Sequence, residues 1–91
     1  MLMTANISVS PNPFTNLVNV EIEGVNENMN YCVVRLYDEK GKILKMLGVS
    51  LHNGINKVLI DRLNMLHTGK YFLDVKSTGG KSIYITTLLK Q

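Results

Sequence analysis

The residue types that most often bind metals or act as nucleophiles are few in this sequence. His52 and His67 are the only histidines, both in segments rich in turn-forming residues, and Cys32 is the only cysteine. A zinc site needs three or four converging ligands, and one cysteine cannot form an intramolecular disulfide. We expect both histidines to be solvated loop residues, Cys32 to be a small buried apolar residue, and neither a metal nor another cofactor to be bound.

Acidic residues offer no better candidate for catalysis. Asp38, Asp61 and Asp74 are far apart in the sequence, and a carboxylate pair of the glycosidase kind must converge in space. Asp38 is followed by Glu-Lys-Gly, which is typical of a turn aspartate that bonds its own backbone. The sequence contains no serine nucleophile elbow, and Gly79-Gly80 is predicted to be a hairpin turn instead of a phosphate loop before a helix. The sequence therefore predicts a protein that is not an enzyme.

Length and composition indicate one small globular domain. The chain has 91 residues, 45% of them apolar and 19% charged, with a net charge of +3. Lys and Arg are scattered, without the basic stripe that follows a phosphate backbone, so we expect no nucleic-acid partner. No apolar run approaches the roughly 20 residues of a membrane span. The first residues do not resemble a secretory signal peptide, so the protein either stays inside the cell or carries its export signal upstream of this sequence.

Seven segments have the composition of β-strands and recur about every ten residues, which favours an antiparallel β-sandwich. The predicted strands are 7–10, 17–23, 31–37, 42–51 with a break at Gly48, 56–61, 71–77 and 82–89. Residues alternate between apolar and polar in the second strand, so one face of it should be buried. The expected inward residues are Val18, Val20, Ile22, Cys32, Val34, Leu36, Val58 and Ile60. The segment 24–30 is predicted to be a polar loop.

The predicted strands are separated by distinct turn motifs. Pro11-Asn12-Pro13 should form a rigid extended kink, because proline fixes φ and lacks a backbone donor, and it could carry the chain from one sheet to the other. Residues 38–41 are predicted to form a hairpin loop in which Gly41 adopts a positive φ. Asn53-Gly54 is typical of a two-residue β-hairpin. Leu63 and Leu66 could fill one end of the core.

Two features bear on the last two predicted strands. Tyr71 follows a turn at Gly69, as in the tyrosine corner of immunoglobulin-like sandwiches, where the hydroxyl bonds to upstream backbone. Leu73 stands where antibody domains have a cysteine and the chain has no tryptophan, so an antibody-type domain is excluded. The strand 82–89 contains no charged residue, and such a strand at an open edge would pair with another chain. We expect it to be covered or central in its sheet.

The order of these motifs resembles that of the C-terminal sorting domains of the type IX (Por) secretion system, type A. The similar segments are 9–14 with its Pro-Asn-Pro, 34–43 with Leu-Tyr-Asp and Gly-Lys, 53–56, 63–71 and the closing strand 80–91. The resemblance extends from Ile7 to Gln91. It departs from the family at the end, where a single lysine, Lys90, follows an uncharged stretch.

The resemblance implies a seven-stranded immunoglobulin-like sandwich over residues 7–91, at the C-terminus of a larger secreted precursor that crosses the periplasm. Residues 1–6 would then be a linker or a remnant of cloning. The expected partners are an outer-membrane translocon and a surface sortase that removes the domain, after which the cargo is released or joined to an anionic lipopolysaccharide. The mature cargo would be secreted or displayed at the cell surface.

Ten residues are candidates for the signal or for the motifs that maintain the fold: Pro11, Asn12, Pro13, Leu36, Tyr37, Asp38, Gly41, Gly69, Tyr71 and Lys90. Leu36, Gly41, Gly69 and Tyr71 are expected to support the fold. The Pro-Asn-Pro motif could equally be read by the translocon or only shape the crossing between sheets. Two other functions stay open, namely an extracellular immunoglobulin-like binding or adhesion module, and self-association through the strand 82–89.

Overall fold

The structure is a computed structural model, and it describes residues 6–24 and 30–91. Its strands are β1 (Asn6–Ser10), β2 (Val18–Glu23), β3 (Tyr31–Asp38), β4 (Ile43–Ser50), β5 (Ile55–Ile60), β6 (Gly69–Ser77) and β7 (Ser82–Lys90). The described residues contain no helix, so the prediction of seven strands in an all-β fold is confirmed. The linker predicted at residues 1–6 and the loop predicted at 24–30 fall mostly outside the described residues.

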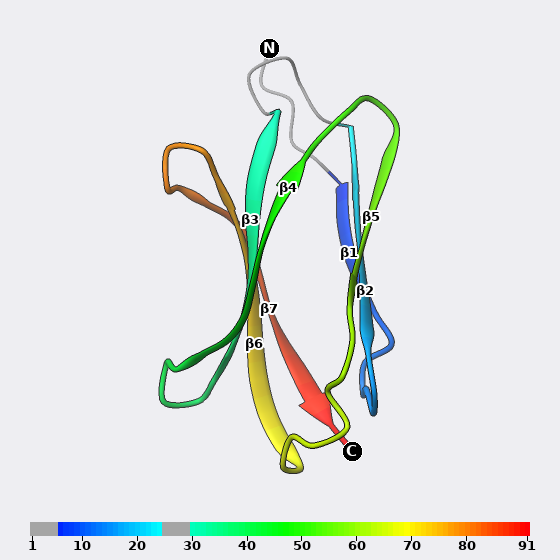
Figure 1. Cartoon of the computed structure of the whole chain (residues 1–91), viewed down its shortest axis with the longest axis vertical. Coiled ribbons are helices and arrows are strands. Elements are labelled where there is room, and N and C mark those ends of the chain that lie inside the picture. Colours follow the sequence, from blue (N-terminus) through cyan, green and yellow to red (C-terminus); the bar gives the residue numbers. More distant parts are fainter. Residues whose placement is uncertain (1–5, 25–29) are drawn as a thin grey trace.

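The strands form two layers that face each other (Figure 1). One sheet has the order β1-β2-β5 and the other has the order β4-β3-β6-β7, and neighbouring strands within each sheet are antiparallel. The fold is therefore the predicted antiparallel β-sandwich. Its first, second and fifth strands share one sheet and its third, sixth and seventh share the other, as do strands A, B and E and strands C, F and G of immunoglobulin-like sandwiches.

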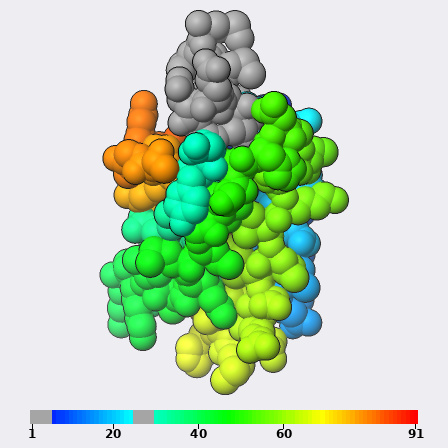
Figure 2. Space-filling view, turned by 45° about the horizontal axis from the view of Figure 1, so that its top comes forward, coloured from blue at the N-terminus to red at the C-terminus, as the bar shows by residue number. Residues whose placement is uncertain are grey.

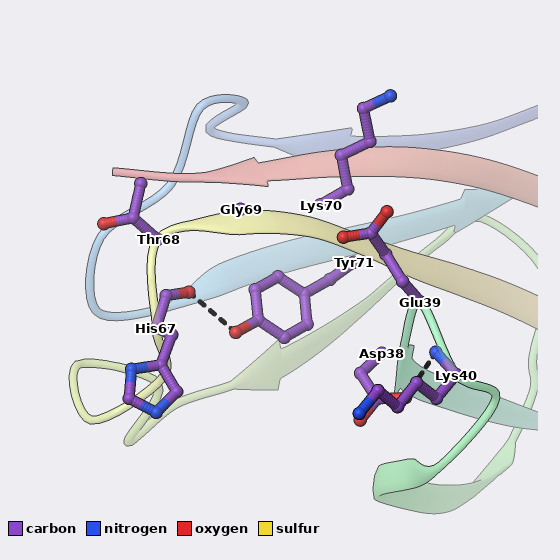
Figure 3. Close-up of a pocket in the computed structure, with 8 residues that line it drawn as sticks. All are labelled: Asp38, Glu39, Lys40, His67, Thr68, Gly69, Lys70 and Tyr71. Atoms are coloured by element: carbon purple, nitrogen blue, oxygen red, sulfur yellow. Dashed lines mark hydrogen bonds between the residues drawn. The ribbon is translucent and has the colours of Figure 1, made fainter.

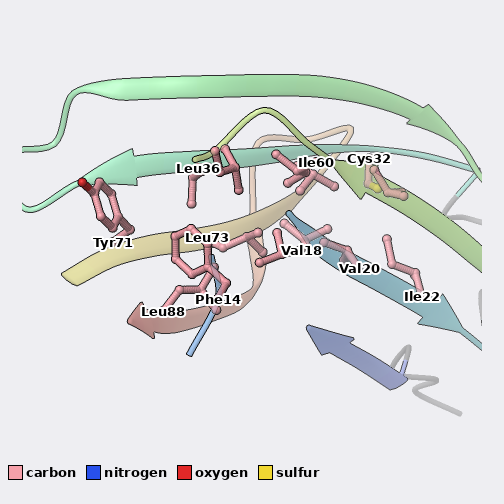
Figure 4. Packing of buried hydrophobic residues seen from close by; sticks show 14 residues of the cluster. Phe14, Val18, Val20, Ile22, Cys32, Leu36, Ile60, Tyr71, Leu73 and Leu88 are labelled. Carbon is pink, nitrogen blue, oxygen red and sulfur yellow. The ribbon is translucent and has the colours of Figure 1, made fainter. Parts of the chain in front are cut away.

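The core lies between the sheets and is formed by the inward side chains of both layers (Figure 4). All eight residues predicted to point inward are buried: Val18, Val20, Ile22, Cys32, Val34, Leu36, Val58 and Ile60. The prediction from alternation is correct because successive side chains of a strand point to opposite faces, so each strand contributes one apolar row to the core. Leu63 is also buried, and Leu66 packs against the cluster from the same loop.

The turn at Asn53-Gly54 does not form the predicted hairpin. Gly54 has the expected positive φ of 100°, but β4 pairs with β3 whereas β5 pairs with β2, so the chain passes from one sheet to the other here. Figure 2 shows the green β4 segment and the yellow-green β5 segment on the same face of the molecule. The local sequence specifies a turn, whereas the partner of each strand is decided by which sheet can bury its apolar row.

The side chain of Asn56 stabilises this crossing. Its Oδ1 accepts a hydrogen bond from the backbone N–H of His52 at 3.0 Å, and its Nδ2 donates to the carbonyls of His52 and Ile22. Asn56 is buried, and these bonds supply the polar partners that a buried amide requires. Asn56 thereby links the turn to β2, which is the neighbour of β5 in the three-stranded sheet.

One further strand prediction, the break at Gly48, is wrong, and the prediction that 82–89 is covered or central is met in part. β4 runs through Gly48 without the predicted break, and Gly48 pairs with Val33. The hydroxyl end of Tyr31 lies over Gly48, so an aromatic side chain covers the glycine on the outer face of the sheet, as is found in other sheets. β7 is an edge strand and not a central one, although the chain after β1 covers its last residues.

Candidate functional site

Four of the five motif segments have residues at one end of the sandwich, whereas the segment 53–56 lies at the other end. This end comprises residues 11–14, the β3–β4 hairpin at 38–42, the loop 61–71 and the end of β7 at 87–91, and we call it the motif pole. It is the lower end of the molecule in Figure 1, where β6 begins and the chain terminates. The turns at 51–54 and 78–81 lie at the other end.

The side chain of Asn12 forms hydrogen bonds with the backbone at the end of β7, in the way that a neighbouring strand would. Its Nδ2 donates to the carbonyl of Thr87 at 3.0 Å, and its Oδ1 accepts from the backbone N–H of Leu89 at 2.9 Å. The side-chain amide supplies one donor and one acceptor, so it reproduces one peptide group of a β-ladder. Pro11 and Pro13 flank it, are exposed, and have no N–H of their own to contribute.

Phe14 continues this contact through its backbone and anchors it in the core. Its N–H donates to Leu89 at 2.8 Å, and its carbonyl accepts from Gln91 at 2.9 Å, which forms an isolated parallel bridge opposite Lys90. The Phe14 ring is fully buried and meets the Tyr71 ring edge to face, with centroids 6.1 Å apart. The predicted crossing between sheets is confirmed, because β1 lies in one sheet and Phe14 bonds to the other.

Tyr71 forms the predicted tyrosine corner. Its hydroxyl donates to the carbonyl of His67, four residues upstream, at 2.7 Å (Figure 3). The ring is buried between the sheets, and Gly69 turns the chain into β6 with a φ of 150°. The bond fixes the end of the 61–68 loop against the first residues of β6, so Gly69 and Tyr71 support the architecture of the motif pole.

The β3–β4 hairpin is organised by Asp38. Its Oδ1 accepts hydrogen bonds from the backbone N–H groups of Lys40 and Lys42, each at 2.9 Å, and its carbonyl accepts from Gly41 at 3.0 Å. Gly41 has a φ of 86°, which favours glycine. The turn role predicted for Asp38 and Gly41 is therefore present in the structure.

A shallow cavity of about 250 Å³ separates this hairpin from the tyrosine corner (Figure 3). Glu39 and Lys40 line one side, and Thr68 and Lys70 line the other. All four residues are exposed. The motif pole therefore combines a buried framework with a small set of exposed polar side chains.

The remaining candidates occupy three different environments. Leu36 is fully buried in the core. Tyr37 lies on the outer face of the four-stranded sheet, where its ring centroid is 5.8 Å from that of Phe72. Lys90 lies opposite Gly69 at the motif pole and is only 8% exposed. Its Nζ donates to the carbonyl oxygen of Gln91 at 2.6 Å.

An ion pair that sequence reasoning missed lies on the outer face of the four-stranded sheet. Arg35 donates to both carboxylate oxygens of Asp74, from Nε at 2.9 Å and from Nη2 at 2.6 Å. This hydrogen bonding raises the pKa of the Arg35 guanidinium above its ordinary value. Both residues fall at outward positions of predicted strands, but the sequence did not indicate that β3 and β6 are neighbours.

The residues considered for catalysis or metal binding do not form a site. His52 belongs to the sheet-crossing turn, whereas His67 lies at the motif pole. Asp38 bonds its own hairpin, Asp74 bonds Arg35, and within residues 6–24 and 30–91 no three potential ligands cluster for a metal ion. Burial raises the pKa of the Cys32 thiol, which disfavours the reactive thiolate.

Comparison with known proteins gives the family of the chain. Residues 8–89 match the family model described as the secretion system C-terminal sorting domain. No curated protein matches the chain. In the part of the chain that the structure describes, no helix is long and apolar enough to cross a membrane. The match covers most of the chain and includes residues of all seven strands, so the chain belongs to the family of secretion system C-terminal sorting domains, which are the C-terminal signals of type IX secretion.

Proposed function

We propose that this domain is a non-catalytic signal that the outer-membrane translocon of the type IX system recognises as a folded surface, and that a surface sortase then removes it from its cargo. The functional unit is residues 7–91, at the C-terminus of a precursor that reaches the translocon through the periplasm. The cargo is released or displayed on the cell surface. The convergence of four separate motif segments at the motif pole is the observation that carries this proposal.

The buried framework and the exposed side chains of the motif pole have different roles in this proposal. Asn12, Phe14 and Tyr71 connect the segments to one another, so they set the shape of the pole. The exposed residues around the cavity, including Glu39 and Thr68, are available to a partner. The translocon therefore reads side chains such as these, held in place by the motif residues.

A fusion experiment tests the sorting function. Residues 1–91 are appended to an exported reporter and expressed in a host with an intact type IX system and in one that lacks it. The expected result is reporter outside the cell only in the intact host, with a loss of about 10 kDa on cleavage, the mass of the domain. Equal retention of the reporter in both hosts would contradict the proposal.

A second pair of variants tests whether the motif pole is the recognised surface. Glu39→Ala with Thr68→Ala removes exposed side chains at the cavity, and Glu23→Ala with Thr78→Ala makes the same chemical changes at exposed positions of the other end. The first pair should reduce secretion while the free energy of unfolding stays within about 0.5 kcal/mol of the original. Secretion that is unchanged in the first pair, or equally reduced in both pairs, would contradict recognition at the motif pole.

A further inference from the structure

The outer face of the four-stranded sheet exposes apolar side chains, and among residues 6–24 and 30–91 no second layer packs against them. Six residues define what we call the apolar outer face: Tyr37, Ile43, Met46, Phe72, Ile85 and Leu89. The registers place Met46 and Ile85 at the two ends of one row that crosses the sheet through Arg35 and Asp74. Met46 is 62% exposed and Ile85 is 61% exposed, and exposed apolar side chains gathered on one face often mark an interaction surface.

The centre of this face offers few directional groups to a partner. The two carboxylate oxygens of Asp74 accept hydrogen bonds from Arg35, and Asp74 is only 3% exposed. The Arg35 guanidinium also lies 5.6 Å from the centroid of the Tyr37 ring. Protein interfaces typically use arginine and aromatic side chains as anchors, but here the arginine is already engaged within the domain. The most exposed side chains in the row are aliphatic.

Charge is distributed unevenly between the two sheets. Residues 31–50 and 69–91, which form the four-stranded sheet and its hairpins, include eight Lys and Arg residues and three acidic residues, for a net charge of +5. Residues 6–24 and 55–67 include two basic and three acidic residues, for a net charge of −1. The apolar outer face therefore belongs to the strongly basic half of the domain.

Lysines border the apolar outer face at both ends. Lys70 and Lys76 alternate with the buried residues of β6, so their side chains project from the outer face along with Phe72. The β3–β4 and β6–β7 hairpins both curve away from the three-stranded sheet, toward the side of this face (Figure 1). They carry Lys40 and Lys81, which are exposed.

We propose that the apolar outer face binds the surface of a membrane that contains anionic lipids. Met46 and Ile85 enter the boundary between headgroups and acyl chains, and the bordering lysines bind the lipid phosphates. A second copy of this face would bring two strongly basic surfaces together, so charge disfavours self-association here. An acidic protein fits the charge, but a row whose most exposed side chains are the apolar Met46 and Ile85 fits a lipid surface better. This proposal is independent of the sorting function.

Vesicle co-sedimentation of the purified 91-residue chain tests the proposal. We expect binding to vesicles of equal phosphatidylcholine and phosphatidylglycerol, little binding to phosphatidylcholine alone, and a loss of binding with added salt. Met46→Ser with Ile85→Ser should weaken binding about tenfold, because it removes the apolar side chains that enter the lipid. Lys76→Gln should weaken it about fivefold, as expected for one charge near an anionic surface.

The opposite sheet supplies a matched control. Ile55 and Leu59 are 49% and 51% exposed on β5, so Ile55→Ser with Leu59→Ser removes similar apolar area from the less basic half and should leave vesicle binding unchanged. Equal weakening by the two pairs, or equal binding to neutral and anionic vesicles, would overturn the proposal. Binding to polyglutamate without binding to vesicles would also overturn the proposal and would indicate an acidic protein partner. A dimer that dissociates in the Met46→Ser variant would overturn it as well and would indicate that this face binds a second copy of the chain.

A fluorescence measurement keeps the test decisive if a serine variant is poorly folded. The chain has no tryptophan, so Met46→Trp and Leu59→Trp each introduce a single probe at an exposed position. We expect a blue shift on addition of anionic vesicles for Met46→Trp and none for Leu59→Trp. A shift in both probes, or in neither, would contradict insertion of this face. Because both experiments use the purified domain, their failure would leave the secretion results unaffected.

Discussion

Asn12 and Leu89 are 77 positions apart, and the backbone N–H of Leu89 donates to the Asn12 side chain at 2.9 Å. With the bond from Asn12 to Thr87, this contact places the chain that leaves β1 along the edge of β7. Edge strands of sheets are usually protected from pairing with other chains. The Pro-Asn-Pro motif therefore protects the C-terminal half of β7 and joins the first and last strands of the domain.

Asn12→Asp should destabilise the domain by about 1–2 kcal/mol although it barely changes the size of the side chain. The substitution replaces the Nδ2 donor by a carboxylate oxygen, which cannot donate to Thr87 and faces its carbonyl. Urea denaturation measures the loss. Asn19→Asp, on the exposed face of β2, is the matched control and should change the free energy of unfolding by less than about 0.5 kcal/mol. Equal losses in the two variants would refute the edge contact.

Tyr71→Phe should reduce the free energy of unfolding by about 1 kcal/mol, because it removes the hydrogen bond to His67 and keeps the ring in the core. Tyr84→Phe is the control, since Tyr84 packs against the same core from the neighbouring strand but lies outside the tyrosine corner. Thermal and urea unfolding of both variants provide the comparison. A loss in Tyr84→Phe as large as that in Tyr71→Phe would show that the corner has no special role.

Arg35→Met should cost about 3 kcal/mol, because it leaves the buried Asp74 carboxylate without its bidentate partner. Arg35→Met combined with Asp74→Leu should recover most of this loss, since no unpaired charge then stays buried. The two single variants and the double variant form a double-mutant cycle measured by urea denaturation. Additive losses would mean that the two side chains do not stabilise each other.

Local patterns in the sequence were sufficient for the strands and the core, whereas pairings between distant strands were not accessible. The alternation of Val18, Val20 and Ile22 predicts which side chains are buried, because a strand has only two faces. Asn53-Gly54 shows the limit of such reasoning, since its turn was predicted correctly but the strands that it joins lie in different sheets. Turn chemistry is local, and sheet membership depends on the packing of the whole chain.

The candidate site shows the same division. Tyr71 could be assigned to a tyrosine corner because its partner is only four residues away. The bonds from Asn12 to β7 could not be predicted, because nothing near Asn12 in the sequence indicates which strand edge it meets. The ion pair between Arg35 and Asp74 was missed for the same reason, since it depends on β3 and β6 being neighbours.

The buried thiol of Cys32 should make stability fall in alkaline solution. Burial raises the pKa of Cys32 above its ordinary value of 9.0 in the folded state, so the unfolded chain loses this proton at a lower pH. The neutral thiol therefore contributes fully to the free energy of unfolding below pH 9. This contribution is lost as the pH rises toward the pKa of the folded state, and the free energy of unfolding falls by up to about 1.4 kcal/mol per pH unit.

Urea denaturation at several values between pH 8 and roughly pH 10.5, a range that begins below the ordinary thiol pKa, checks this expectation. Cys32→Val removes the titrating group and keeps a side chain of similar size, so the stability of the original protein should fall relative to the variant above pH 9. All other ionisable groups are the same in both proteins, so their effects cancel in the difference. Parallel pH profiles would mean that Cys32 has the same pKa in the folded and unfolded chains, which its complete burial contradicts.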